Sequence, residues 1–268
     1  MSILSIYSNE YLLELYKETC DLGKTANKLN ICLETLRKYF ISNNLKYNKQ
    51  TRYSCNDNFF SEDNEKSFYW AGFIAADGNI DKAKPRVCIT QASVDHNHLE
   101  KFKNDINYNG KIFDVVRKEH REKFLKKEYY SSYIKITSRQ IINDLSRFNI
   151  TPNKSKTYQF PEYLSENENI RHFIRGIIDG DGWIYKDGGS SIIGLSGTFF
   201  CVNFIFNFLK NKLRINTGKC SIRPNGLTIM QFTKTKDNAK IINYLYDGAN
   251  IFLDRKEIIA EQISPKSF

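Results

Sequence analysis

The chain has 268 residues, a large apolar fraction and an excess of positive charge. Hydrophobic residues make up 41% of the chain and aromatic residues 14%, which excludes a wholly disordered protein. No apolar run approaches the ~18–20 residues of a membrane span, and the N-terminal residues lack the basic and apolar regions of a secretory signal. We therefore expect a soluble intracellular protein, in the cytoplasm, the nucleoid or an organelle matrix.

The positive charge is distributed along the whole chain. Lys and Arg number 40 and Asp and Glu number 30, which gives a net charge of +10. Residues 1–60 carry +2, residues 61–165 carry +4 and residues 166–268 carry +4. A basic protein most often has an anionic partner, and this distribution favours a long docking surface for nucleic acid over a basic tail. Ribosomal and heparin-like partners remain open at this point.

The residue types that bind zinc do not occur at zinc-site spacing. The six cysteines include no Cys-x-x-Cys pair, which disfavours a zinc ribbon. We expect them to be reduced thiols, most of them in the core. His96 and His98 are expected to be surface residues that open a helix.

Residues 1–45 are predicted to form a small helical module. An apolar stripe predicts a first helix, and two further helices are predicted over residues 24–29 and 33–41, with Leu36 facing the core. This pattern is typical of a helix-turn-helix, in which the last helix reads DNA, although a plain three-helix cap also fits it. If the module is a helix-turn-helix, the DNA-contacting residues on the outer face of the last helix are Thr35, Arg37 and Lys38.

Residues 46–63 are predicted to be a linker between this module and the rest of the chain. They are polar and lack periodic apolar residues. Lys46 and Arg52 are placed to follow a phosphate backbone, and a merely solvated linker fits the sequence equally well.

The rest of the chain contains an internal repeat, with one copy over residues 64–165 and the other over residues 166–268. Residues 70–78 read Trp-Ala-Gly-Phe-Ile-Ala-Ala-Asp-Gly, and residues 174–182 read Ile-Arg-Gly-Ile-Ile-Asp-Gly-Asp-Gly. Each nonapeptide leads into two predicted strands, a helix, two more strands and a closing helix. We therefore predict an α+β fold of two αββαββα units, each the size of a small domain.

The repeated nonapeptide has the spacing of a close helix–helix contact. Gly72 and Ala76 lie four residues apart in the first copy, as do Gly176 and Gly180 in the second. Small residues at this spacing allow two helix backbones to approach more closely than the usual ~8–10 Å. We therefore expect the two helices to pack on each other, each ending at an Asp-Gly pair whose Gly allows a left-handed exit.

Asp77 and Asp181 are the candidate metal ligands at these helix ends. The last carbonyls of a helix have no intrahelical partner, so Ala76 and Gly180 offer oxygens beside the carboxylates. Oxygen ligands at the negative end of a helix dipole suit hard divalent cations such as Mg²⁺. Two carboxylates at a pseudo-twofold axis repel each other unless cations bridge them to phosphates, which favours phosphodiester hydrolysis on both strands of a duplex. The alternative, a close-packed helix with a glycine cap, explains one copy of the motif better than two.

The two nonapeptides resemble the motif of the LAGLIDADG homing endonucleases in their single-chain, two-motif form, and the resemblance covers about residues 64–262. It implies saddle-shaped antiparallel sheets that follow the major groove, in a monomer that acts as a pseudo-dimer. It also implies cleavage of both strands of a long DNA site that depends on Mg²⁺ or Mn²⁺, with Ca²⁺ in a non-cleaving complex. Asp77 and Asp181 then occupy the catalytic acidic positions. Three residues depart from the leading, second and sixth positions of the motif: Trp70, Arg175 and Ala75.

Further catalytic roles follow only from this resemblance. Gln91 matches a glutamine that family members often place near the end of the second strand, close to the attacking water. Its counterpart in the second copy is Gly197. Lys154 and Lys256 match a lysine that follows the last helix of each unit, with Arg255 as the alternative to the second of them.

Outward residues of the two sheets are the expected DNA contacts. In the last strand of each unit, alternation leaves Tyr133, Lys135 and Gln231 on the face opposite the core. In the major groove, Lys135 could donate hydrogen bonds to guanine, and the amide of Gln231 could form hydrogen bonds with adenine. The full set of sheet candidates is Arg86, Arg117, Tyr133, Lys135, Lys219, Arg223 and Gln231.

Together these features favour a site-specific double-strand DNA endonuclease whose N-terminal module extends its footprint on DNA. Its expected target is the DNA that borders the insertion site of its own gene. A non-catalytic transcriptional regulator and an intron RNA maturase, both on the same fold, are the alternatives. Because such a regulator need not keep the acidic pair, the presence of both Asp77 and Asp181 favours the enzyme.

Overall fold

The chain divides into a small N-terminal unit, Met1–Ser54, and a larger unit, Cys55–Phe268. The computed structural model describes residues 6–19, 22–47, 53–120 and 126–265, and the side chains of residues 117–127 lie outside that description. Within the described part, every helix is too short or too polar to cross a membrane.

The described part of the N-terminal unit contains three short helices, α1 (Asn9–Thr19), α2 (Leu22–Lys28) and α3 (Leu33–Ser42). Asn30 has a positive φ of 51° and makes the turn between α2 and α3. The helices are amphipathic, and their apolar faces enclose one core. The core side chains are Leu12, Tyr16, Leu22, Ala26, Leu36 and Phe40.

The larger unit contains the predicted repeat. In the first copy the elements are α4 (Glu65–Asp77), β1 (Gly78–Ile80), β2 (Arg86–Ala92), α5 (His96–Asp105), β3 (Phe113–His120), β4 (Lys126–Thr137) and α6 (Arg139–Ser146). In the second they are α7 (Ile170–Asp181), β5 (Gly182–Asp187), β6 (Ser190–Gly197), α8 (Phe199–Leu213), β7 (Lys219–Ile222), β8 (Thr228–Phe232) and α9 (Thr235–Tyr246), followed by α10 (Asp254–Ile263).

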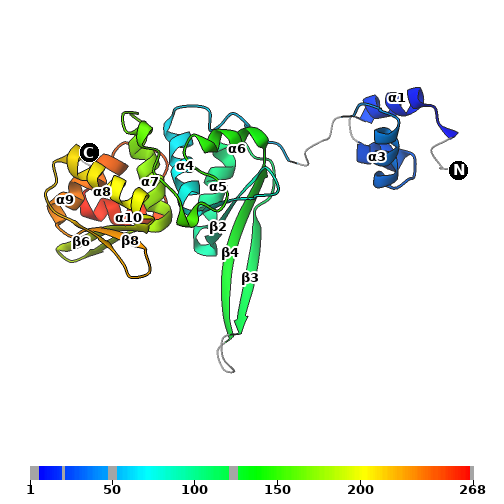
Figure 1. The fold of residues 1–268 in the computed structure, drawn as a ribbon. Helices are drawn as coiled ribbons and strands as arrows, with labels where there is room; N and C mark the ends of the chain where they lie inside the picture. The colour runs from blue at the N-terminus through cyan, green and yellow to red at the C-terminus, as the bar shows by residue number, and fades with distance from the viewer. Residues whose placement is uncertain (1–5, 20–21, 48–52, 121–125, 266–268) are drawn as a thin grey trace. The chain divides into compact units, whose positions relative to one another are not determined.

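Each copy forms one antiparallel four-stranded sheet with the same topology. The strand orders are β1-β2-β4-β3 and β5-β6-β8-β7. The prediction of an α+β fold with two αββαββα units is therefore confirmed. Within the larger unit, α4 and α7 lie side by side between the two sheets (Figure 1).

Polar capping residues explain where three helices begin, and alternating apolar residues explain which face of each strand is buried. Asn64 caps α4 by accepting a hydrogen bond from the backbone N–H of Ser67 at 2.9 Å, and Ser138 and Thr198 cap α6 and α8 in the same way. In the strands, every second side chain is buried under the helices. The buried strand residues include Val87, Ile89, Ile134, Ile136, Ile193, Leu195, Met230 and Phe232.

Two local predictions differ from the structure. The second half of the predicted linker packs on the larger unit, because Phe60 is fully buried and the N–H of Asn56 donates to the carbonyl of Ile106 at 2.8 Å. Two adjacent aromatic residues anchor this stretch without helical or strand periodicity, so no pattern in the sequence indicated it. The sequence Gly110-Lys111-Ile112 also predicts the start of a strand, whereas β3 begins at Phe113.

The two sheets differ in the length of their last two strands in chain order. In the first sheet β3 and β4 have 8 and 12 residues, whereas β7 and β8 in the second have 4 and 5. The β3–β4 pair therefore extends well beyond the rest of its sheet, as Figure 1 shows.

Candidate metal centre and nucleic-acid interface

The candidate site begins with the contact between α4 and α7. A Cβ added to Gly72 would lie 2.1 Å from the carbonyl oxygen of Phe173, and one added to Gly176 would lie 2.1 Å from that of Tyr69. No side chain fits at such distances, so the two backbones touch. Farther along, a Cβ added to Gly180 would lie 2.4 Å from the Cβ of Ala76. The small residues thus allow the two helix ends to meet.

The glycines that follow the two acidic residues serve a different purpose from the one expected. Gly78 and Gly182 have φ values of −80° and −90° and extended conformations, so the predicted left-handed exit is wrong. Space explains the glycines instead. An added Cβ would lie 2.7 Å from the carbonyl oxygen of Ile74 at Gly78, and 2.7 Å from that of Ile178 at Gly182.

Asp77 and Asp181 are the last residues of α4 and α7, and Oδ2 of Asp77 lies 3.3 Å from the position of a Cβ added to Gly180, the residue before Asp181. Burial raises the pKa of Asp77, while the hydrogen bond from Gln91 and nearby lysines partly oppose the shift. Packing around Asp181 and the charge of Asp77 raise the pKa of Asp181 to about 6, although the residue remains open to solvent. The charged forms of both groups are therefore destabilised in the absence of a cation.

This donor set fits a hard divalent cation. Two carboxylates with raised pKa values and the adjoining carbonyls of Ala76 and Gly180 are all oxygen donors. Among the described residues, no group of three or more His, Cys, Asp or Glu side chains is arranged to hold a metal ion. Mg²⁺ commonly takes only one or two carboxylates and completes its coordination shell with water and phosphate oxygens. A pair of carboxylates is therefore a sufficient protein contribution to a Mg²⁺ site.

The two carboxylates have different neighbours on the sheet side. The amide Nε2 of Gln91 donates to Oδ2 of Asp77 at 2.9 Å. Gly78 pairs with Ile89 and Gly182 pairs with Leu195, so Gln91 and Gly197 occupy equivalent positions two residues farther on. Because Gly197 has no side chain, a cavity of about 270 Å³ lies beside Asp181, lined also by Lys154.

The two predicted lysines are both buried at the helix ends, in unequal settings. The Lys154 ammonium lies 3.5 Å from the carbonyl oxygen of Ala76, and burial lowers its pKa. The Lys256 ammonium donates to the carbonyls of Ile178, Asp179 and Gly182 at 2.6, 2.7 and 2.6 Å. Burial lowers the pKa of Lys256 to about 8.

Arg255, the alternative to Lys256, forms an ion pair with an acidic residue of the first unit. Its Nε lies 3.1 Å from both carboxylate oxygens of Asp95, which precedes α5 in the first unit. The ion pair joins the two units of the repeat, and of these two neighbouring cations it is Lys256 that contacts carbonyls at the end of α7.

No protein-family model and no curated protein matches the chain. Among solved structures, the homing endonuclease I-WcaI bound to its DNA recognition sequence is similar over 72% of this chain and 85% of its own, at 15% identity and a TM-score of 0.53. The larger unit has the LAGLIDADG homing endonuclease fold.

Two further structures share this likeness with lower scores. The LAGLIDADG homing endonuclease I-GzeII in complex with DNA target matches over 75% of this chain and 88% of its own, at 15% identity and a TM-score of 0.46. Full-length DUF199/WhiA from Thermatoga maritima matches over 80% of this chain and 66% of its own, at 13% identity and a TM-score of 0.42. The assignment of the LAGLIDADG fold rests on the first structure.

A buried polar network beside the LAGLIDADG helices was not predicted from the sequence. Asp179 accepts hydrogen bonds from the hydroxyls of Tyr69 and Tyr246 at 2.8 and 2.6 Å and from the N–H of Leu253 at 2.8 Å. The Tyr69 hydroxyl also lies 3.0 Å from Nε2 of His98. His98 was expected at the surface but is buried, and burial lowers its pKa to about 3. The one sequence feature that could have indicated this network is an acidic residue, Asp179, within an otherwise apolar helix pattern.

The unusual second residue of the second motif, Arg175, is a structural ion. It is fully buried, and its guanidinium donates to the carbonyls of Leu245 and Ile251 at 2.6 and 2.9 Å and to Glu65 at 2.7 Å. It therefore ties the start of α4 to the loop after α9. Substitution of Arg175 would leave its buried partners unpaired and should strongly destabilise the fold. These hydrogen bonds are with the start of α4, the end of α9 and the loop after it, and not with Asp77 or Asp181.

Strand register places the predicted contacts on one face of each LAGLIDADG sheet. In the first sheet, Lys135 is opposite Cys88 and Arg86 is opposite Thr137, all on the face away from the helices. The Lys135 ammonium lies 4.3 Å from the ring centroid of Tyr133, and Arg86 forms an ion pair with Asp81.

In the second sheet Lys219 is opposite Gln231, and Arg223 is exposed in the turn that follows β7. In each sheet, the described candidate residues are therefore arranged so that they could contact the same ligand. The backbone of Arg117 pairs with that of Tyr129, but its side chain lies outside the described part of the chain, as does all of Arg52.

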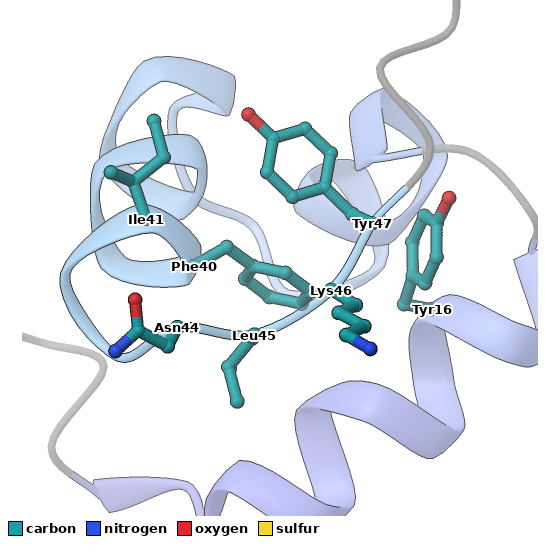
Figure 2. A pocket seen from close by; sticks show the side chains of 7 residues that line it. All are labelled: Tyr16, Phe40, Ile41, Asn44, Leu45, Lys46 and Tyr47. Atoms are coloured by element: carbon teal, nitrogen blue, oxygen red, sulfur yellow. The ribbon is translucent and has the colours of Figure 1, made fainter.

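The predicted contacts of the N-terminal unit lie on its surface. Thr35, Arg37 and Lys38 are exposed on α3, and Nη1 of Arg37 lies 3.7 Å from Oε2 of Glu34. Lys46 lies beside a hollow of about 680 Å³ between α3 and the chain that follows it (Figure 2). The hollow is lined by Tyr16, Phe40, Ile41, Asn44, Leu45, Lys46 and Tyr47.

Most of the described cysteines are not core residues. Of Cys32, Cys55, Cys88, Cys201 and Cys220, all free thiols, only Cys201 is buried. The expectation of mostly buried thiols is therefore wrong. Cys88 is on the outward face of β2, opposite Lys135.

Proposed function

We propose that this protein is a site-specific, double-strand DNA endonuclease that depends on a divalent cation. The observation that carries the proposal is the pair of carboxylates at the junction of α4 and α7, where Asp77 and Asp181 have raised pKa values. Helix packing alone gives no reason to place two carboxylates together, because each disfavours the charged form of the other. On a basic chain, this arrangement suits cation-assisted hydrolysis of a phosphodiester.

The proposed partner is double-stranded DNA, bound by a monomer that acts as a pseudo-dimer. The fold likeness to I-WcaI, bound to its DNA recognition sequence, supports this class of partner. The two sheets each offer an outward face with basic and amide side chains, as expected for major-groove contacts. We propose that Lys135 reads guanine and Gln231 reads adenine, with the other sheet candidates positioning the phosphates.

Each residue of the proposed active site has its own role. Asp77 and Asp181, with the carbonyls of Ala76 and Gly180, would hold the cation. Bound Mg²⁺ would polarise a phosphate oxygen and lower the pKa of a water molecule. Gln91 orients the Asp77 carboxylate through its hydrogen bond, and its amide is placed to meet a water near that carboxylate.

Lys154 is the proposed catalytic cation. It lines the cavity beside Asp181, and the charges of Asp181 and Asp77 act on its ammonium. The distance from this ammonium to the carbonyl oxygen of Ala76 is long, at 3.5 Å, so the ammonium is available to a phosphate oxygen that enters the cavity.

The N-terminal unit is proposed to extend the DNA footprint as a helix-turn-helix. Support comes from its three helices around one core and from the exposed polar face of α3, with Thr35, Arg37 and Lys38. We propose a division into a module of residues 1–45, a connection over residues 46–63 whose second half packs on the larger unit, and LAGLIDADG units over residues 64–165 and 166–268.

The test is cleavage of a plasmid that carries the DNA flanking the protein's own gene. With Mg²⁺ or Mn²⁺ we expect a linear product with cuts in both strands at one site, and with EDTA an intact plasmid. Ca²⁺ should support binding without cleavage. Specific binding with intact strands in both Mg²⁺ and Mn²⁺ would contradict the proposal and support a transcriptional regulator. Binding only to the RNA transcript of the interrupted gene would support a maturase.

A further inference from the structure

Lys256 has a different environment from its counterpart Lys154. Its side chain is 3% exposed, and its ammonium makes three hydrogen bonds, to the carbonyls of Ile178, Asp179 and Gly182. An ammonium has three N–H donors, so these bonds use its full donor capacity. A phosphate or a water molecule can therefore bind this ammonium only if it displaces a carbonyl.

The three carbonyls lie on both sides of the metal-binding segment. Ile178 and Asp179 precede Gly180 and Asp181 in the last turn of α7, whereas Gly182 opens β5. The carbonyl of Gly180, a proposed cation ligand, is not one of the three acceptors. The ammonium thus holds the chain before and after the proposed ligands and leaves the ligands themselves open.

The physical effect of such a contact is to fix a helix end. The last carbonyls of a helix lack intrahelical partners, and a cation there is favoured by the helix dipole. The corresponding lysine contact at the end of α4 is weaker, because the Lys154 ammonium lies 3.5 Å from a single carbonyl oxygen, that of Ala76. Asp77 is instead held by Gln91, which Asp181 lacks because Gly197 takes that place.

We propose that Lys256 is a positioning residue that clasps the backbone of residues 178–182 and so holds the Gly180 carbonyl and the Asp181 carboxylate in the geometry that a divalent cation needs. It acts through that backbone and does not touch DNA. This inference rests on the proposed function for the identity of the site. It replaces the catalytic role that the resemblance implied for Lys256 and keeps that role for Lys154.

The first test needs neither DNA nor a metal ion. Hydrogen–deuterium exchange of the full-length protein is followed at the amides of residues 180–182 in wild type, Lys256→Met, Lys256→Arg and Lys154→Met. We expect exchange at least ten times faster in Lys256→Met, and within twofold of wild type in Lys154→Met. Unchanged exchange in Lys256→Met would overturn the clasp.

Lys256→Arg separates geometry from charge. Arginine keeps the positive charge, but its planar guanidinium cannot direct three N–H groups at three carbonyls that converge on one nitrogen. A clasp predicts faster exchange in this variant too, whereas a role of charge alone predicts wild-type exchange. If Lys256→Met fails to fold, Lys256→Arg still decides the question.

The second test is Mn²⁺ binding to the protein in complex with an uncleavable DNA site, measured by electron paramagnetic resonance. Removal of a cation near two carboxylates should tighten Mn²⁺ binding by electrostatics alone, and we expect this in Lys154→Met. For a clasp, Lys256→Met should weaken Mn²⁺ binding about tenfold even though a positive charge has been removed. Tighter binding in Lys256→Met would overturn the proposal.

The outcomes separate the inference from the proposed function. If wild type neither binds Mn²⁺ nor cuts DNA, the proposed function fails, while the exchange experiment still reports on the backbone contact. If wild type binds Mn²⁺ and cuts DNA but exchange in Lys256→Met is unchanged, the proposed function stands. The positioning role of Lys256 is then wrong, and the catalytic role that the resemblance implied is the remaining one.

Discussion

The C-terminal ends of α4 and α7 carry the same motif but are supported in different ways. At the first end, Gln91 holds the carboxylate of Asp77 from the neighbouring strand. At the second, Gly197 leaves a cavity beside Asp181, and Lys256 holds the backbone instead. The repeat is strict where two backbones touch, at Gly72 and Gly176, because no side chain fits there. It is relaxed where more than one side chain can support a carboxylate.

The largest effect should come from the strict part of the repeat. In Gly72→Ala and Gly176→Ala, the new Cβ would lie 2.1 Å from a carbonyl oxygen of the facing helix. The helices would have to separate, and we expect a loss of at least about 4 kcal/mol of unfolding free energy in each variant. Urea denaturation measures it. Gly189→Ala, with nothing within 4 Å of its added Cβ, is the control, and equal stability of all three variants would refute the close contact.

The next effect should separate the two carboxylates. Gln91→Ala removes the hydrogen bond to Asp77, and we expect one DNA strand to be cut ~10–100 times more slowly, in the range that one positioned catalytic group contributes. The other strand should change little. Strand-specific end labels on a nicked substrate measure both rates, with Gln140→Ala on α6 as the control. Equal slowing of both strands would show that the two ends act as one.

The converse change sharpens the same comparison. Gly197→Gln places an amide in the cavity beside Asp181, and its added Cβ would lie in tight contact with a methyl group of Val202, at 3.3 Å. Once the Val202 side chain has shifted by a few tenths of an ångström, we expect the rates at the two strands to differ by less than in wild type. A larger difference would mean that the cavity serves the substrate and should stay open.

A smaller effect is expected from the N-terminal unit. Removal of residues 1–54 follows the observed division of the chain and should leave the larger unit folded. We expect a ~10–100-fold decrease in DNA affinity and a shallower dependence on salt, by ~0.9 for each phosphate that the shortened protein no longer neutralises. Fluorescence anisotropy at several salt concentrations measures both. An unchanged salt slope would exclude a DNA-binding role for this unit.

The smallest effect concerns the stability of the metal-free protein. The pKa of Asp181 is raised in the folded state to about 6. A carboxyl with a raised pKa adds stability while it is protonated, and this contribution disappears as pH rises from about 4 through 6. Because Asp181 is open to solvent, we expect a decrease of no more than about 1 kcal/mol, seen as the difference between wild type and Asp181→Asn. A difference that does not change with pH would contradict the raised pKa.

The sequence predicted the features that depend on spacing. Small residues four positions apart predicted the helix contact, alternating apolar residues predicted the strands, and the two Asp-Gly pairs predicted the positions of the carboxylates. The motif could not show the extended conformation of Gly78 and Gly182, because the steric reason for a glycine there arises only after the strands pack. The triple contact of Lys256 was equally hidden, since it joins residues far apart in the chain.

The buried network of Asp179 was hidden for the same reason. Its partners Tyr69 and Tyr246 lie on α4 and α9, and an isolated acidic residue in an apolar pattern does not identify them. Phe60 likewise reads as part of a polar linker until the larger unit buries it. Tertiary contacts without periodicity are therefore the main part of the structure that the sequence left open.

The central claim, that Asp77 and Asp181 hold a divalent cation for cleavage of both DNA strands, is tested most directly with Asp77→Asn and Asp181→Asn. Asp187→Asn, an exposed acidic residue of β5, is the matched control. With Mg²⁺, double-strand cleavage should fall by at least ~1,000-fold in the first two variants and stay unchanged in the third, while DNA binding in Ca²⁺ remains within about tenfold of wild type. Cleavage of both strands at wild-type rates by either of the first two variants would contradict the account.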